Sequence, residues 1–424
     1  MQLPETLEGW LSLLEARHGQ AIQLGLDRVR TVRDALDLPQ TCPVFTIGGT
    51  NGKGSTCALL EAVLLASGYR VGLYTSPHLL KYNERVRIDG RDASDEALVE
   101  AFAEVERARG DVPLTYFEHG TLAAWVAFSH ARLDAIILEV GLGGRLDAVN
   151  VFEPDCAIVT SVAMDHMDFL GDNREAIGFE KAGIFRAGRP AICSDPMPPA
   201  SLVAHAEAIG ARLWVTGRDF GFAGDQNQWA FWLAGGSRRG GLAYPALRGT
   251  NQLLNASAVM AACEAVRDIL PVPMQAIRQG FMLVELPGRF QVLPGRPTVV
   301  LDVAHNPQAA GVLNENLASM GFFPETWAVL GMLGDKDVAG VVRLLRDRVD
   351  HWLLTSLPGP RGLSAARLAE ILRELGVSGD VSEHDSPRAA YQVARDGAAE
   401  GDRIVIFGSF LTVADVLAAV KAPQ

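Results

Sequence analysis

A glycine-rich segment with one lysine, GGTNGKGST at residues 48–56, has the residue types and spacing to bind phosphate groups. It follows a β-branched apolar run and precedes a helical stretch. A strand, a glycine loop and a helix N-terminus together offer backbone N–H groups and a positive dipole end to an anion. The spelling departs from the usual phosphate loop, G-x-x-x-x-G-K-[ST], because Ile47 and Gly54 occupy the positions of a glycine and a hydroxyl residue.

We interpret this loop as a triphosphate site in which Lys53 neutralises phosphate oxygens. Ser55 or Thr56 would supply the hydroxyl that Gly54 displaces from its usual place. The loop alone does not distinguish a kinase, a GTPase switch and a ligase. The structural alternative is a β–α turn whose glycines only allow tight packing.

Polar side chains also follow three of the predicted strands, and ligands of open parallel sheets bind beyond the carboxyl ends of the strands. They are Ser76 and His78 after one strand, Glu139 after a second, and Asp165, His166 and Asp168 after a third. Mg²⁺ prefers oxygen ligands and completes its octahedron with phosphates, which suits Ser76 and Glu139. His166 is a less usual magnesium ligand but is acceptable for Mn²⁺. Each of these residues alone also fits a turn, a cap or a core position.

The elements that must position these residues are short apolar runs alternating with helical stretches. The predicted strands of the first half are 43–48, 71–76, 135–141, 156–163 and 190–195, with an amphipathic helix at 121–133. Continuous apolar strands separated by helices indicate a mainly parallel sheet with helices on both faces. The sequence therefore predicts an α/β fold with an N-terminal P-loop-type domain.

The pattern restarts after a Pro-Gly segment at 284–290, which we interpret as an interdomain hinge. Before it, 217–249 suggests a small β excursion and 251–270 a helix. After it, further strands are predicted at 298–304, 326–332, 351–357 and 403–410. We therefore expect two domains, residues 1–287 and a smaller Rossmann-like α/β domain at residues 288–424.

The composition is that of a soluble globular protein, with 48% apolar and 21% charged residues among 424. The net charge of −12 argues against a nucleic-acid-binding surface. No apolar run is long enough to predict a membrane helix, and the N-terminus does not resemble a signal peptide. The five cysteines are scattered without metal-binding spacing, which favours reduced thiols and a cytoplasmic location.

Nine motifs in order carry a resemblance to a known family: GTNGKGST, TSPHL, NERV, TYFEHGTLAA, LEVGLGGRLDA, DHMDFLG, EKAGIF, LPGRF and DVAHNP. With them the chain resembles the dihydrofolate synthase/folylpolyglutamate synthase family, which belongs to the Mur ligase superfamily. The altered phosphate loop is the variant of that family. The resemblance covers nearly the whole chain and implies a central domain like that of the Mur ligases.

The resemblance implies a set of ATP-binding and metal-binding residues. The ATP contacts would be Gly49, Thr50, Asn51, Gly52, Lys53, Gly54, Ser55, Asn255, Arg289 and Asp302. One Mg²⁺ would use Ser76 and Glu139, and a second would use Glu139, His166 and a carboxylated Lys181. A neutral, partly buried lysine can add CO₂ and become an anionic carbamate; a salt-bridge role for Lys181 remains the alternative. The catalytic set would be Lys53, Glu139, His166 and Lys181.

The resemblance also implies the sites of the two other substrates. The pteroate or folate site would contain Ile22, Gln23, Leu24, Thr115, Tyr116, Phe117, Glu118, Leu146, Asp147 and Ala148. Candidates for the incoming glutamate are Arg85, His305 and Ser409. The Phe117 ring could stack on a pterin, although the residue taken by itself favours a core position. One departure is His119, where related chains often have another aromatic or a small residue.

The implied activity is ATP-driven ligation of L-glutamate to dihydropteroate and to reduced folates through an acyl phosphate, by a monomer acting on small molecules. One alternative is a Mur-type ligase acting on a UDP-sugar, but those enzymes carry a separate N-terminal UDP-binding domain before their phosphate loop. Another alternative is a P-loop NTPase switch, but the chain has no N-K-x-D guanine signature.

Overall fold

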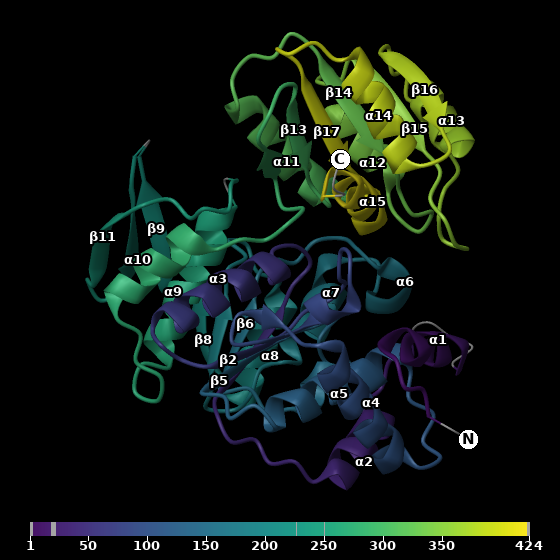
Figure 1. Cartoon of the computed structure of the whole chain (residues 1–424). Coiled ribbons are helices and arrows are strands. Elements are labelled where there is room, and N and C mark those ends of the chain that lie inside the picture. Colours follow the sequence, from purple (N-terminus) through teal and green to yellow (C-terminus); the bar gives the residue numbers. More distant parts are fainter. Residues whose placement is uncertain (1–2, 18–22, 226, 250, 422–424) are drawn as a thin grey trace. The chain divides into compact units, whose positions relative to one another are not determined.

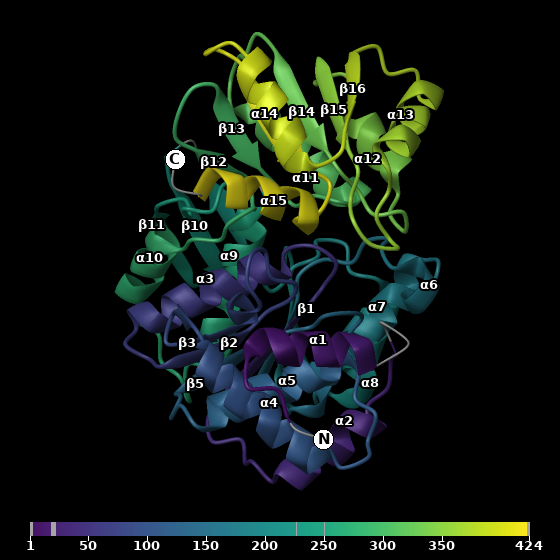
Figure 2. The same ribbon diagram turned by 45° about the vertical axis from the view of Figure 1, so that its right-hand side comes forward.

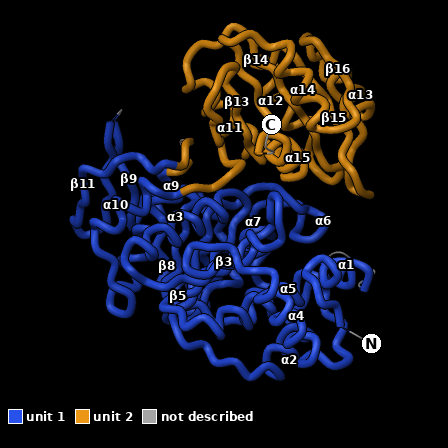
Figure 3. The backbone as a smooth tube through the Cα atoms, in the orientation of Figure 1, with its two compact units in different colours: residues 1–246, 253–284 blue, residues 247–252, 285–424 orange. Residues whose placement is uncertain are grey.

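The computed structural model describes residues 3–17, 23–225, 227–249 and 251–421. The chain divides into two compact units, which Figure 3 colours separately: residues 1–246 with 253–284, and residues 247–252 with 285–424. The predicted boundary at residues 287 and 288 lies just beyond this division. The segment 247–252 belongs to the second unit, although the sequence pattern placed it in the first domain.

The N-terminal unit is built around a mixed sheet, and the predicted α/β class is confirmed (Figure 1). In spatial order its strands are β4 (Arg91–Asp92), β3 (Val86–Ile88), β2 (Val71–Tyr74), β5 (Ala135–Glu139), β1 (Val44–Gly48), β6 (Cys156–Val159), β7 (Pro190–Cys193) and β8 (Arg212–Val215). Strands β2, β5, β1, β6, β7 and β8 are parallel to one another. Strand β3 pairs antiparallel with β2, and β4 pairs antiparallel with β3. Strands β1, β2, β5, β6 and β7 are buried along their whole length, as expected of parallel strands covered on both faces.

Helices cover both faces of this sheet. The unit contains α1 (Leu7–Arg17), α2 (Asp27–Leu36), α3 (Lys53–Ala66), α4 (Asp95–Arg109), α5 (Tyr116–Ser129), α6 (Met167–Leu170), α7 (Arg174–Ala182), α8 (Ala200–Ile209), α9 (Gln252–Ala265), α10 (Met274–Leu283) and the 3₁₀ helices η1 (Tyr82–Arg85) and η2 (Ala148–Val151). One core joins α1, α2, α4 and α5 to the sheet, and its members include Trp10, Phe102 and Leu138. Helix α3 contacts β1, β2 and β5 and packs on α10, and Figures 1 and 2 show α3, α9 and α10 lying together.

A small antiparallel sheet accounts for the predicted β excursion after β8. Its strands are β9 (Phe220–Gly224), β10 (Trp229–Leu233) and β11 (Arg238–Leu242). The Trp229 ring stacks against Phe281 of α10, with the ring centroids 6.1 Å apart. This contact attaches the small sheet to the same helical layer as α3.

The C-terminal unit has its own sheet, in the order β12 (Gln291–Leu293), β13 (Thr298–Leu301), β17 (Arg403–Phe407), β14 (Thr326–Leu330), β15 (His351–Thr355) and β16 (Asp380–His384). All neighbours pair in parallel except β12, which is antiparallel to β13. Its helices are α11 (Pro307–Ser319), α12 (Val338–Leu345), α13 (Ala365–Glu374), α14 (Pro387–Gly397) and α15 (Phe410–Lys421). The predicted second α/β domain is thus present, with an additional strand at each edge of its sheet.

Within the described parts of the chain, no helix combines the length and the apolar character needed to span a bilayer.

Candidate active site

The phosphate loop has the backbone that its glycines predict. Strand β1 ends at Gly48 and α3 begins at Lys53, so four residues connect them. Gly49 and Gly52 have φ values of 141° and 92°, in the left-handed region that other residues rarely adopt. The loop therefore places the N-terminus of a helix, with its positive dipole end, directly after the carboxyl end of a central strand.

Hydroxyl residues at the end of β6 hold this loop in place. The Thr50 N–H donates to the Ser161 carbonyl at 2.7 Å, and the Asn51 N–H donates to Ser161 Oγ at 3.0 Å. The Thr160 hydroxyl donates to the Asn51 carbonyl at 2.7 Å. Thr160 and Ser161 were not predicted as site residues. Their signal in the sequence is a pair of hydroxyl residues at the end of the strand that neighbours β1.

The predicted ATP-binding residues of this unit surround the loop. The Lys53 ammonium donates to the carbonyls of Gly49 and Thr50, at 3.1 and 3.2 Å, so its side chain lies over the loop. Asn255 of α9 is buried against it, since a Cβ at Gly52 would lie only 2.7 Å from Asn255 Oδ1. Any larger residue at position 52 would therefore have to displace Asn255.

Gly54, Ser55 and Thr56 lie in the first turn of α3. The side chains of Ser55 and Thr56 are both buried, so either hydroxyl lies inside the helix–loop junction. The Thr56 hydroxyl makes no hydrogen bond to any described residue. The structure leaves the choice between these two hydroxyls open.

The predicted magnesium ligands Ser76 and Glu139 are in direct contact. Glu139 ends β5 and pairs in register with Ile47 of β1, next to the phosphate loop. The Ser76 N–H, just after β2, donates to Glu139 Oε2 at 3.1 Å. Burial and the negative charge of Glu139 raise the pKa of the Cys57 thiol, while Lys53 lowers it, so both charges lie near that one thiol. The loop lysine and the Glu139 carboxylate thus share one edge of the sheet.

Lys181 lies inside the protein, on α7, with a side chain that is 3% exposed. Burial first, and then the charge of Lys53, lower the pKa of Lys181 from 10.5 to about 7, although Asp165 and Asp147 act in the opposite direction. A lysine with this pKa is substantially neutral at physiological pH, which is the state that adds CO₂. The setting therefore fits a carboxylated lysine.

His166 precedes the short helix α6 and has a left-handed backbone with φ 51°. Its N–H donates to Asp165 Oδ1 at 2.9 Å. Asp165 also acts on Lys181, so the segment carrying His166 approaches the same region. Among the described residues, no three His, Cys, Asp or Glu side chains form a ready metal cage. A cation at Glu139 and His166 would thus need oxygen ligands from other groups, which a carbamate and phosphates supply.

The structure brings together the three segments predicted for the pteroate site. The Gly25 N–H donates to the Leu146 carbonyl at 3.4 Å, which joins the segment of Gln23 and Leu24 to that of residues 146–148. A Cβ at Gly141 would lie 2.6 Å from the Phe117 ring and 3.2 Å from Asp147 Oδ2, so the segments of Phe117 and Asp147 meet at this glycine. Ile22, also predicted here, lies outside the described residues.

Several members of this set are occupied by contacts within the protein. Asp147 Oδ2 accepts from the Leu142 N–H at 2.8 Å and Oδ1 from the Val149 N–H at 3.0 Å, while Ala148 begins η2 in a buried position. Burial raises the pKa of Asp147 to about 6, although these backbone N–H groups lower it. Asp147 therefore fixes the turn that follows β5.

Thr115 and Glu118 form a capping box at the start of α5: the Glu118 N–H donates to Thr115 Oγ1 at 3.2 Å, and the Thr115 N–H donates to Glu118 Oε2 at 2.8 Å. His119, the departure from the family pattern, is fully buried against the rings of Trp10 and Phe102. Its role is in the core beneath the start of α5.

Arg85 belongs to the same unit and lies next to the pteroate segment. Its Nε donates to His78 Nδ1 at 2.8 Å, and its guanidinium lies 5.3 and 5.6 Å from the ring centroids of Tyr82 and Tyr116. Burial and the charge of Arg85 lower the pKa of His78 to about 4, which keeps the imidazole neutral as an acceptor. Arg85 is thus held among the rings of His78, Tyr82 and Tyr116.

The four site residues predicted in the C-terminal unit, Arg289, Asp302, His305 and Ser409, also lie close together. Asp302 accepts hydrogen bonds from two backbone N–H groups, and its pKa is raised by burial while Arg289 and His305 lower it. The Arg289 guanidinium lies 5.1 Å from the Phe410 ring, and the His305 ring lies 6.4 Å from it. Ser409 directly precedes Phe410, and its Oγ accepts from the Leu411 N–H. Residues from three separate segments therefore meet near the Phe410 ring.

Comparison with known proteins decides the family. The chain matches the models of the Mur ligase middle domain over residues 47–195 and of the Mur ligase glutamate ligase domain over residues 288–410. It is 44% identical to the dihydrofolate synthase/folylpolyglutamate synthase of Escherichia coli strain K12, over 99% of this chain and 97% of that protein. The chain belongs to the dihydrofolate synthase/folylpolyglutamate synthase family.

Solved structures of this family agree with the fold. The structure of Escherichia coli FolC in complex with DHPP and ADP superposes with a TM-score of 0.94 at 44% identity, covering 100% of this chain and 99% of that one. A bifunctional folylpolyglutamate synthase/dihydrofolate synthase with Mn, AMPPNP and L-glutamate bound has a TM-score of 0.91 at 46% identity, covering 99% of this chain and 100% of that one. The predicted family, fold and ligase class are therefore confirmed.

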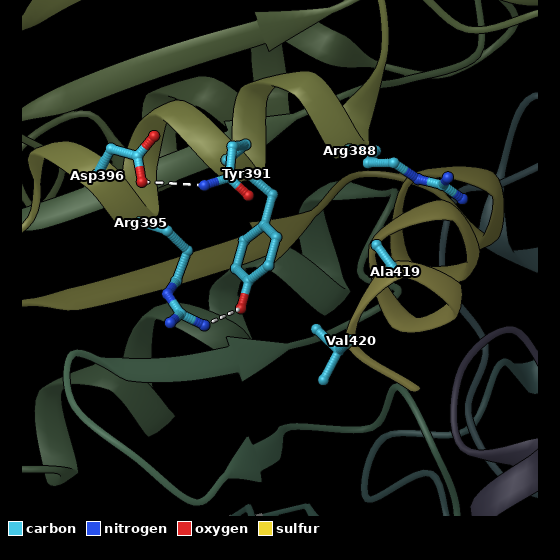
Figure 4. A pocket seen from close by; sticks show the side chains of 7 residues that line it. Arg388, Tyr391, Arg395, Asp396, Ala419 and Val420 are labelled. Carbon is cyan, nitrogen blue, oxygen red and sulfur yellow. Dashed lines mark hydrogen bonds between the residues drawn. The ribbon is translucent and has the colours of Figure 1, made fainter. Parts of the chain in front are cut away.

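A separate cavity of about 300 Å³ lies in the C-terminal unit, between α14 and α15 (Figure 4). It is lined by Arg388, Tyr391, Gln392, Arg395, Asp396, Ala419 and Val420. Figure 4 shows Arg395 directed at the Tyr391 hydroxyl, which accepts its hydrogen bond, and Gln392 is bonded to Asp396. None of the family's predicted site residues lines this cavity.

Proposed function

We propose that this protein uses ATP to ligate L-glutamate to 7,8-dihydropteroate, giving dihydrofolate, and to reduced folates, giving polyglutamates. The observation that carries the proposal is the convergence, in one unit, of a phosphate loop, the Ser76–Glu139 contact and the three pteroate segments. Membership of a family whose solved structures contain ADP with DHPP, and AMPPNP with L-glutamate, supports the same substrates.

The proposed chemistry needs no nucleophile from the protein. The acceptor carboxylate attacks the γ-phosphorus of ATP, which gives an acyl phosphate and ADP. The amine of glutamate then attacks the acyl carbon, and the tetrahedral intermediate collapses with loss of phosphate. Because ATP activates the acid, the protein's contribution is to bind, align and exclude water.

We assign these tasks to named residues. The loop N–H groups and Lys53 would hold the ATP phosphates, with Asn255 shaping the loop. Ser76, Glu139, His166 and a carboxylated Lys181 would hold divalent cations, whose charge neutralises the phosphates when bound. Phe117 and the segments around Gln23 and Leu146 would orient the acceptor. Arg289 and Asp302 would bind ATP, and Arg85, His305 and Ser409 would bind the incoming glutamate.

We also propose that the protein acts as a monomer in the cytoplasm. All five cysteines are free thiols, as expected in a reducing compartment. Light scattering during gel filtration tests the oligomeric state, and a mass of twice the chain mass of 45.5 kDa would contradict it. Fractionation of the cells tests the location.

The test of the function is product formation from dihydropteroate, ATP and L-glutamate, followed by mass spectrometry. A mass increase of one glutamate residue, with one ADP released per ligation, is the expected result. The Lys53→Ala variant is the control for contaminating ligases. ADP release without any ligated product would instead favour an NTPase switch, and ligation only to a UDP-sugar would favour a peptidoglycan-type ligase.

A further inference from the structure

Arg28 on α2 joins two of the segments that we assign to the acceptor. Its Nη2 donates to Glu118 Oε1 at 2.8 Å and its Nε donates to Glu118 Oε2 at 3.3 Å, so the two side chains form a bidentate ion pair. The same Nη2 donates to the Gln23 carbonyl at 3.0 Å. The Glu118 side chain is 4% exposed and the Arg28 side chain 20%, so solvent screens the pair weakly.

The other side of Glu118 fixes the start of α5. Because Glu118 Oε2 also accepts from the Thr115 N–H, both carboxylate oxygens are engaged within the protein. A single buried carboxylate thus connects Arg28, and through it the Gln23 carbonyl, to the cap of the helix that carries Tyr116 and Phe117. Two residues beyond Gln23, the Gly25 N–H reaches Leu146 of the third segment.

We infer that Arg28 is a positioning residue for the pteroate acceptor. Arg28 holds the Gln23–Leu24 backbone against the start of α5, and this allows the Gly25 N–H to bond to the Leu146 carbonyl. The inference rests on the proposed function for the identity of the acceptor. Arg28 would act on the acceptor through its hydrogen-bond partners, Glu118 and the Gln23 carbonyl. A planar guanidinium can serve a carboxylate fork and a carbonyl at once, whereas a lysine ammonium is a point donor without that fork.

The kinetic test compares Arg28→Met and Arg28→Lys with a matched control, Arg30→Met. Arg30 lies on the same helix and pairs at 3.6 Å with exposed Asp27, so its removal changes the charge equally without touching Glu118. We expect Arg28→Met to raise the KM for dihydropteroate by roughly 10- to 100-fold, the scale of a small misplacement of a substrate. The KM for ATP and kcat should change by less than about threefold, and Arg28→Lys should lie between. Arg30→Met should match the wild type.

A second measurement does not depend on the reaction. Hydrogen exchange of the peptide covering residues 23–26 should be faster in Arg28→Met than in Arg30→Met, because the Gly25–Leu146 hydrogen bond loses its support. If Arg28→Met does not fold, Arg28→Lys provides both measurements. Unchanged exchange, or an equal rise of the KM for ATP and for dihydropteroate, would overturn the inference. A wild-type protein that makes no dihydrofolate would refute the proposed function, and the exchange result would still decide whether Arg28 fixes this segment.

Discussion

Helix α3, which follows the phosphate loop, contains a buried carboxyl group whose ionisation should destabilise the folded protein. Glu61 lies in the middle of α3 and is 3% exposed. Its Oε1 lies 3.4 Å from Arg87 Nε, yet neither atom makes a hydrogen bond among the described residues. Burial raises the pKa of Glu61 from 4.5 to about 7, although the charge of Arg87 lowers it.

The sign of the pH dependence follows from proton uptake. Between pH 4.5 and 7 the folded protein holds a proton on Glu61 that the unfolded chain has lost, so the free energy of unfolding falls as the pH rises through this window. The difference in pKa corresponds to about 3 kcal/mol, at about 1.4 kcal/mol per pKa unit. The Glu61→Gln variant cannot ionise and should escape this loss.

We therefore expect Glu61→Gln to be close to the wild type in stability at about pH 5 and more stable by up to about 3 kcal/mol at about pH 8. The assay is urea unfolding of both proteins across this range, followed by tryptophan fluorescence. Glu106→Gln is a control of opposite sign: burial raises the pKa of Glu106, but hydrogen bonds from Arg109 and Arg17 lower it to about 2. Removal of the Glu106 charge in Glu106→Gln should lower the free energy of unfolding at neutral pH. A difference in stability between wild type and Glu61→Gln that does not vary with pH would refute the reasoning.

Three further predictions concern the site. Replacing Lys53 or Glu139 by Ala should lower ligation by at least about 100-fold with an unchanged circular dichroism spectrum, and near-normal turnover in either variant would contradict their assignment. Wild-type protein in ¹³C-bicarbonate should show a carbamate signal by NMR that Lys181→Met lacks, and the same variant should not ligate; a signal in both would place the carbamate elsewhere. His78, whose pKa is about 4 because of burial and Arg85, does not titrate between about pH 5.5 and 8, so His78→Gln should keep the shape of the pH–rate profile in that range.

Much of the fold was predictable because its signals are local. Continuous apolar runs predicted β1, β5 and β6, and each is buried along its length. The spelling of the glycine loop predicted a strand, a turn and a helix N-terminus, and Gly49 and Gly52 have the left-handed backbone that such a turn needs. In each case the residue type and its immediate neighbours determine the conformation.

The missed elements lack such local signals. Strand β16 is polar and mostly exposed, so its position at the edge of the second sheet depends on pairing with β15 and not on hydrophobicity. Strand β8 is also only partly buried. The segment 247–252 is short, and its membership of the second unit depends on long-range packing.

The site residues divide in the same way. The chemistry of some could be inferred from the local sequence, whereas the role of others depends on partners that are distant in the chain. The roles of Lys53 and Glu139 could be predicted because the two residues lie at or just beyond the ends of neighbouring strands. For Glu118, the family motif predicts a ligand contact, and the structure adds partners that the motif does not indicate, since both oxygens accept hydrogen bonds from Thr115 and Arg28.

Arg28 and Glu118 are 90 residues apart, so no spacing rule in the sequence could join them. Once the pair is seen, the three pteroate segments need not each contact the acceptor through side chains. A buried ion pair that loses one partner leaves an uncompensated charge, so separating the two chain segments at this pair would be costly. For the proposed acceptor site, we therefore expect the arrangement of the backbone to determine specificity as much as the residues that face the acceptor.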